Sequence, residues 1–443
     1  MRWGSVFDCG PLRHDEAMPK KSLRPSPQPE SGPEGPLLGT WRAAGLSMAV
    51  IASAAAYGLG ALLGAAVVIP VIYALTRLRA YAPDARSTAE LIGAALGPRA
   101  GFAAGVIQLF AYLALAAKFA IALGVLLLMD FSSGADPAKV VPWLPVGALV
   151  AAVAVGAVVC WVSTRAVASV VAVLVIAGLL VYVYLAVAVT ARVAAGSDAV
   201  VIGTAATPSQ LSGQLVGFGV GMVGVELVTV RNARIAAPGR SMSLAVAVVT
   251  GAAVVLWVGD HQGVAGPWRW SAKFLAEAVP EFYADAGRTW MAVAGIALAA
   301  AAALASGWAA VRVGAGLAVA REATPNAGLR VAVAGLVAAM AGVLSAPGLR
   351  GIATVVFGAA ALLLVVLYVF ATEANSRIPG DSVVAWWVRL IVPALAVVAA
   401  IKPVADAHFA AVEVATVIAA VFGVCAAVAA ASLSSGPRIP GKI

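Results

Sequence analysis

The sequence predicts an all-α polytopic membrane protein, and three observations lead to this fold class. Of the 443 residues, 62% are hydrophobic and only 11% are charged, which leaves too little polar surface for a soluble domain. Apolar runs of about 18 or more residues recur along the whole length, and each can cross ~30 Å of hydrocarbon as a helix. The Lys and Arg residues gather in alternate loops, as they do in membrane proteins.

The first 36 residues are polar and rich in proline, so they predict a disordered tail that builds no core. The first apolar run begins only near Ala43, which argues against a signal peptide. Twelve membrane spans follow, at residues 39–57, 60–78, 101–129, 142–162, 167–191, 211–230, 242–259, 288–312, 329–346, 351–371, 384–401 and 407–432. The first two share few residues, and one long helix there would make the count eleven.

The distribution of positive charge predicts the orientation of these spans. With a cytoplasmic N-terminus, 21 of the 29 Lys and Arg residues fall in cytoplasmic segments and 7 in outside segments, and Lys118 lies within a span. Because cytoplasmic loops carry the excess of positive charge, both termini are expected in the cytoplasm, including the tail at 433–443. This pattern also explains the net charge of +9 without a nucleic-acid partner.

An internal repeat predicts the architecture. The stretches "STAELIGAALGPRAG" (87–101) and "SAKFLAEAVPEFYADAG" (271–287) are short amphipathic segments, each opened by a serine cap and followed by a long span. They fall on opposite sides of the membrane, as two inverted five-helix repeats at 37–191 and 211–371 require. Two appended helices occupy 384–432. Such repeats place the substrate at mid-membrane, where the first helix of each repeat breaks.

The sixth span carries the strongest local signal, in "VGFGVGMVGVELVTV" (216–230). Each glycine costs about 1 kcal/mol of helix propensity, and an acid deep in a span costs about 3 kcal/mol. We interpret this as a helix broken near Gly219, Gly221 and Gly224, where free backbone groups and Glu226 line a cavity. Amides at a helix N-terminus suit a substrate carboxylate, and carbonyls at a C-terminal end suit its ammonium.

Two alternatives remain for this span. Gly213, Gly217 and Gly221 are spaced by four, as in helices that pack closely. Glu226 lies five residues before Arg231, so it is also compatible with a solvated acid near the membrane surface.

Other spans hold further candidates. Lys118 lies ~16 Å from the end of its span, which is too deep for its ammonium to reach the membrane surface comfortably. This position predicts that Lys118 is a partner of Glu226, a proton carrier or a member of a structural ion pair. Tyr112 on the same helix is a candidate pocket residue or a packing aromatic. Ser306 either joins the coupling site or bonds the carbonyl one turn back. In the first span, Ser53, Ala54 and Ala55 are small enough for close substrate approach.

The sequence contains no phosphate-binding loop, HExxH or GxSxG motif, and its three cysteines and three histidines are scattered. We therefore expect no enzyme activity, no cofactor and no bound metal.

Four stretches resemble permeases of the amino acid–polyamine–organocation superfamily. They are "LGTWRAAGLSMAVIASAAAYGL", "LTRLRAYAPDARSTAELIGAALGPRAGFAAG", "VGVELVTVRNARIAAPGR" and "SGWAAVRVGAGLAVAREATP". The third is similar to the sixth-helix G-F-E signature, with Val225 where an aromatic residue is usual. The resemblance implies a leucine-transporter-like ten-helix core and a substrate site at Ser53, Ala54, Ala55, Gly221, Gly224 and Glu226. Proton-coupled members often carry a lysine in the fifth helix, and residues 167–191 have none.

These observations predict a multi-pass protein of the cell membrane that moves an amino acid or related amine by alternating access. The candidate driving forces are coupling to H⁺ or Na⁺ and exchange. The alternative is a sensor or assembly subunit that keeps the fold and transports nothing.

Overall fold

The computed structural model of the protein describes residues 38–52, 60–131, 141–194, 224–235, 237–261, 286–320, 327–379 and 410–433. All regular elements within these ranges are helices, which confirms the predicted fold class. Nine helices of this described part are long and apolar enough to cross a membrane. Both predicted tails, the predicted span at 384–401 and most of the second amphipathic segment lie outside the described residues.

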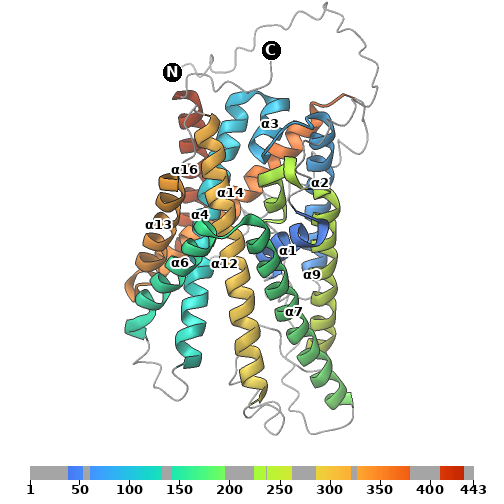
Figure 1. The fold of residues 1–443 in the computed structure, drawn as a ribbon, viewed down its shortest axis with the longest axis vertical. Helices are drawn as coiled ribbons and strands as arrows, with labels where there is room; N and C mark the ends of the chain where they lie inside the picture. Colours follow the sequence, from blue (N-terminus) through green and yellow to red (C-terminus); the bar gives the residue numbers. More distant parts are fainter. Residues whose placement is uncertain are drawn as a thin grey trace, which may run out of the picture. The chain divides into compact units, whose positions relative to one another are not determined.

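The helices follow the order of the predicted spans (Figure 1). Their bounds are α1 (Thr40–Ile51), α2 (Gly60–Tyr81), α3 (Thr88–Leu96), α4 (Pro98–Phe131), α6 (Leu144–Trp161), α7 (Thr164–Ala194), α9 (Pro238–His261), α12 (Ala286–Ala320), α13 (Ala327–Leu344), α14 (Arg350–Ser376) and α16 (Ala410–Leu433). Three 3₁₀-helices complete the set, namely η2 (Val141–Trp143), η3 (Val225–Arg234) and η4 (Pro347–Leu349).

Helix α1 is too short to cross a membrane. Its 12 residues extend only ~18 Å, against ~30 Å of hydrocarbon. Every residue from Ala43 to Ile51 is buried, as expected for a helix that is apolar all round and surrounded by protein. Helix α1 ends at Ile51 and α2 begins at Gly60, but residues 53–59 between them lie outside the described residues, so the count of one or two helices here stays a prediction.

Helix α3 confirms the amphipathic segment predicted at 87–101. The Ser87 hydroxyl accepts a hydrogen bond from the Glu90 N–H at 3.2 Å, and the Glu90 carboxylate accepts one from the Arg86 N–H at 2.8 Å. The first of these bonds satisfies an amide that a helix N-terminus otherwise leaves free, and the second holds the residue that precedes the cap. The helix ends at Gly97, whose φ of +98° favours glycine.

Helices α4 and α12 form the centre of the bundle. Helix α12 packs against α4, α6, α7, α13, α1 and η3. Its buried central stretch, residues 299–311, consists mostly of alanine, and small side chains allow transmembrane helices to approach closely. Close approach also marks the α1–α7 crossing, where a Cβ on Gly45 would lie 2.4 Å from the Cβ of Ala172.

Helix α1 and η3 lie side by side and antiparallel, although they belong to different predicted repeats. At one end, Leu38 forms an isolated β-bridge with Ile235, just beyond η3. At the other end, the Ser47 hydroxyl donates a hydrogen bond of 2.6 Å to the Val225 carbonyl. The C-terminal end of α1 and the N-terminal end of η3 therefore meet inside the bundle.

Candidate functional site

The described part of the sixth crossing is not an α-helix. Gly224 has a φ of +108°, a left-handed conformation that residues with a Cβ rarely adopt, and η3 follows as ten residues of 3₁₀-helix. The Gly224 N–H donates to the hydroxyl of Tyr368 on α14 at 2.9 Å. A Cβ at this position would also lie 2.4 Å from Cγ1 of Val50 on α1. Glycine is therefore required here by conformation and by space.

Glu226 lies two residues further on and is completely buried. Its Oε1 accepts a hydrogen bond of 2.6 Å from the Tyr112 hydroxyl on α4, and its Oε2 accepts one of 2.6 Å from the Tyr368 hydroxyl on α14. The alternative of a solvated acid near the membrane surface is therefore wrong. We call Gly224, Glu226, Tyr112 and Tyr368 the Glu226 cluster.

The Glu226 cluster joins three elements that are distant in the sequence. Both tyrosine side chains are buried, and each carboxylate oxygen has its own donor. A buried carboxylate is tolerated only when hydrogen bonds replace its lost hydration, and the two hydroxyls provide such bonds. The result is a polar bridge from η3 to α4 and α14 within an apolar bundle.

Sequence reasoning placed Gly224, Glu226 and Tyr112 among the candidates, and the structure brings these three together. It missed Tyr368. A signal was present, because Tyr368 and Asn375 are polar, lie seven residues apart and so share one face of a helix that is otherwise largely apolar. Sequence reasoning also missed Ser47, whose hydroxyl ties α1 to η3.

Lys118 does not reach the Glu226 cluster. Its side chain is exposed, its ammonium lies 5.8 Å from the ring centre of Phe119, and both carboxylate oxygens of Glu226 bond tyrosines instead. The reason is angular. Lys118 follows Tyr112 by six residues, which places it about 120° away around α4. A coupling role for Lys118 stays a prediction.

Ser306 is fully buried on α12, and within the described part of the chain its hydroxyl has no hydrogen-bond partner. It does not bond the carbonyl one turn back, as one of the two interpretations required. Ser53, Ala54, Ala55, Gly219 and Gly221 lie outside the described residues, so their predicted roles stay predictions.

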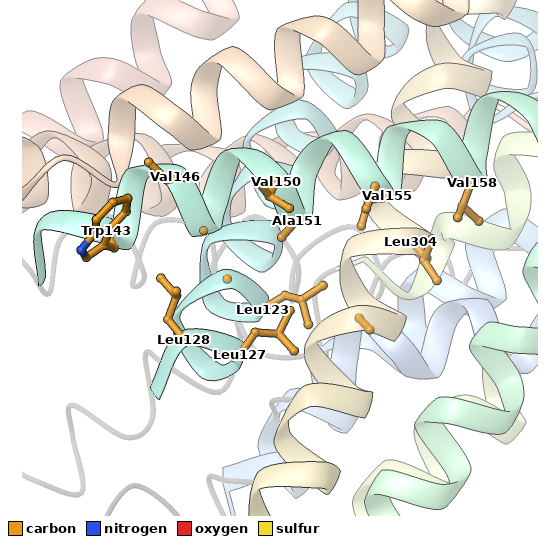
Figure 2. A pocket seen from close by; sticks show the side chains of 14 residues that line it. Leu123, Leu127, Leu128, Trp143, Val146, Val150, Ala151, Val155, Val158 and Leu304 are labelled. Carbon is orange, nitrogen blue, oxygen red and sulfur yellow. The ribbon is translucent and has the colours of Figure 1, made fainter. Parts of the chain in front are cut away.

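A cavity of about 490 Å³ lies away from the Glu226 cluster, between α4, α6 and α12 (Figure 2). Its walls include Leu123, Leu127, Val150, Val155 and Leu304, and its only aromatic lining residue is Trp143. Such an apolar surface offers nothing to a charged solute, so this cavity is not a suitable substrate site.

The described residues also lack an obvious metal centre. Among them, no three His, Cys, Asp or Glu side chains gather closely enough to hold a metal ion.

Comparison with solved structures supports a transporter fold. Three crystal structures of variants of a manganese transporter from Eremococcus coleocola are similar to this chain, with TM-scores of 0.56, 0.56 and 0.57. Sequence identity is 13–14%, and the alignments cover 89% of this chain and 94% of the transporter. No protein-family model and no curated protein matches the sequence. At this identity the likeness concerns the fold, and membership of the predicted superfamily stays a prediction.

Proposed function

We propose that the protein is a secondary active transporter that moves an amino acid or related amine by alternating access. Tyr112, Glu226 and Tyr368 form its inner gate. The observation that carries the proposal is the buried carboxylate of Glu226, which fastens η3, in the predicted sixth span, to α4 and α14. A solute that passes between these elements has to separate them, so the bridge opposes passage while it is intact.

The meeting of two helix ends supports a zwitterionic substrate. Carbonyls at the C-terminal end of α1 carry partial negative charge, and amides at the N-terminal end of η3 carry partial positive charge. Ser47 and Gly224 hold these two ends against each other. A site flanked by both ends can bind an ammonium and a carboxylate on the same molecule.

The same geometry argues against a transition-metal cargo such as the manganese of the structural neighbours. First-row divalent ions are bound by several carboxylate, imidazole, thiolate or carbonyl ligands. In the described residues, the one acid of the Glu226 cluster has both oxygens engaged by hydroxyls, and no group of three metal-binding side chains is present.

The test is uptake or exchange by the purified protein in liposomes. Labelled amino acids and amines are supplied across gradients of pH and sodium, and labelled Mn²⁺ is a separate arm. We expect uptake or exchange of an amino acid or amine and none of Mn²⁺. Mn²⁺ uptake would overturn the assigned substrate class, and the absence of any flux would favour the sensor or assembly subunit.

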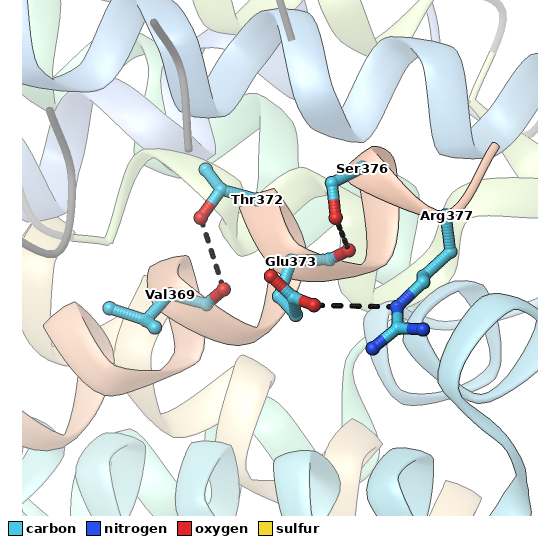
Figure 3. Close-up of polar contacts among 5 residues, drawn as sticks. All are labelled: Val369, Thr372, Glu373, Ser376 and Arg377. Carbon is cyan, nitrogen blue, oxygen red and sulfur yellow. Dashed lines mark hydrogen bonds and ion pairs between the residues drawn. The ribbon is translucent and has the colours of Figure 1, made fainter. Parts of the chain in front are cut away.

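Glu226→Gln tests the gate in the same liposomes. It replaces two charge-assisted hydrogen bonds by weaker neutral ones, and a loss of about 1.4 kcal/mol corresponds to a tenfold change in the gate equilibrium. We expect transport to fall about tenfold, because the weakened gate stays open and an alternating-access cycle requires it to close again. The control is Glu373→Gln on α14, which removes the same charge from a partly exposed pair with Arg377 (Figure 3) and should leave transport unchanged.

A further inference from the structure

A second chain of hydrogen bonds lies beside the Glu226 cluster and links η3 to α3. The Oγ1 atoms of Thr88 and Thr229 lie 2.6 Å apart, and both residues are buried. The Thr229 hydroxyl donates to the Glu226 carbonyl at 2.6 Å. The Gln108 amide donates to Thr88 Oγ1 at 3.4 Å.

Counting hydrogens fixes the direction of this chain. A threonine hydroxyl has one hydrogen to donate, and that of Thr229 is used on the Glu226 carbonyl. The Thr88 hydroxyl must therefore donate to Thr229. The chain then runs in one sense, from the Gln108 amide through Thr88 and Thr229 to the Glu226 carbonyl, so that successive bonds strengthen one another.

The 3₁₀ geometry of η3 explains why the residues that bond α4 and α3, Glu226 and Thr229, lie on one edge of it. A 3₁₀-helix has three residues per turn, so Glu226 and Thr229 project from the same edge. On the opposing side, Gln108 and Tyr112 are four residues apart and share one face of α4. Glu226 meets Tyr112, and Thr229 meets Thr88 beside Gln108.

Helix α3 is fixed to α4. A Cβ on Gly101 would lie 2.5 Å from the Ala89 carbonyl oxygen and 2.7 Å from Cα of Gly93, so the two backbones touch. Helix α3 also packs against η3, and the side-chain hydrogen bond between the two threonines links them. Helices α3 and α4 therefore act as one body, to which η3 is attached at two points.

We propose that Thr88 and Thr229 form a latch between α3 and η3 that must open before the inner gate can open. The proposal rests on the proposed function, since it assigns a regulating contact to the same gate. Thr88 and Thr229 are positioning residues. They hold η3 in the register in which Glu226 faces both tyrosines, and they contact no substrate themselves.

The first test follows the latch without any substrate, by hydrogen–deuterium exchange of η3 in the purified full-length chain. Thr88→Val and Thr229→Val keep the side-chain shape and remove the hydroxyl. Each should speed exchange of the η3 amides by between about twofold and tenfold, the factor for one buried hydrogen bond. The free-energy change derived from exchange in the double variant should be smaller than the sum of the changes in the two single variants, because both substitutions remove the same contact.

The matched control is Thr372→Val on α14. Its hydroxyl is also buried, but it bonds the Val369 carbonyl of its own helix (Figure 3), so η3 exchange should not change. Exchange that accelerates equally in α4, α9 and η3 would indicate general destabilisation and would overturn the latch.

The second test closes the latch covalently, by Thr88→Cys with Thr229→Cys in a chain whose three native cysteines are replaced by serine. The short approach of the two side chains places them within reach of a disulfide. Oxidation should slow η3 exchange and abolish transport, and a reductant should restore both. Failure of the pair to oxidise would contradict the geometry.

The outcomes separate the two proposals. If the oxidised protein transports as fast as the protein treated with reductant, the latch is wrong and the proposed function stands. If oxidation slows η3 exchange but no solute is ever transported, the link between α3 and η3 stands, and the proposed function falls together with the gating role of the link.

Discussion

Replacing either tyrosine of the Glu226 cluster by phenylalanine should destabilise the protein, and the two variants should differ in a direction set by the structure. Tyr112→Phe removes one hydrogen bond to a carboxylate, a loss of about 1.5–3 kcal/mol. Tyr368→Phe removes a bond of the same kind and also the acceptor of the Gly224 N–H. An unpaired buried N–H adds about 1–3 kcal/mol, so Tyr368→Phe should cost more by that amount.

The measurement is equilibrium unfolding of the purified variants in one detergent, with Tyr184→Phe as the control. The Tyr184 side chain is 63% exposed, so its variant should change the free energy of unfolding by less than about 0.5 kcal/mol. A second comparison places Tyr112→Phe in a Glu226→Met background. There the cost of Tyr112→Phe should fall toward zero, because the bond partner is already absent.

Two results would refute this reasoning. Equal costs for the two tyrosine variants would mean that the Gly224 N–H does not depend on Tyr368. An undiminished cost of Tyr112→Phe in the Glu226→Met background would mean that Tyr112 stabilises the protein by packing alone.

Three further changes have expected outcomes that unfolding measurements can check. Gly224→Ala should destabilise the protein more than Gly97→Ala, because both have positive φ but only the first places a Cβ against Val50; equal losses would contradict the close contact. Asn375→Leu should stabilise the protein by about 1–3 kcal/mol, since the buried amide has no partner among the described residues, and a loss would reveal a hidden one. Ser87→Ala should lower the free energy of unfolding by about 1 kcal/mol, because the cap of α3 is lost. An unchanged free energy of unfolding would mean that the cap does not stabilise the protein.

The sequence was sufficient for the parts of the fold that depend on composition and local chemistry. Apolar runs located the membrane helices, because a helix in hydrocarbon needs about 20 apolar residues whatever its neighbours are. The serine cap predicted for the segment at 87–101 located the start of α3, because capping involves only residues close together in the chain. Gly224 and Glu226 marked the place where the described chain is not α-helical, since both are costly in a continuous membrane helix.

The partners of Glu226 depend on how distant segments pack, and local patterns carry little of that information. Tyr368 is 142 residues from Glu226, and only the packing of α14 against η3 brings the two together. Lys118 illustrates the reverse error. Its depth in the membrane suggested a partner for Glu226, but depth leaves out the direction in which a side chain points around its helix.

A last prediction follows from the meeting of α1 and η3. If the negative end of one and the positive end of the other flank the substrate, a ligand needs both an ammonium and a carboxylate to use both ends. In thermal-shift measurements, the amino acid that binds should stabilise the protein, by mass action. Its decarboxylated amine and its deaminated acid should each do so only at concentrations at least about tenfold higher, since each loses one charged contact of about 1.5–3 kcal/mol. Equal binding of the amine and the amino acid would mean that the η3 amides hold no carboxylate, and would reassign the substrate to a simple amine.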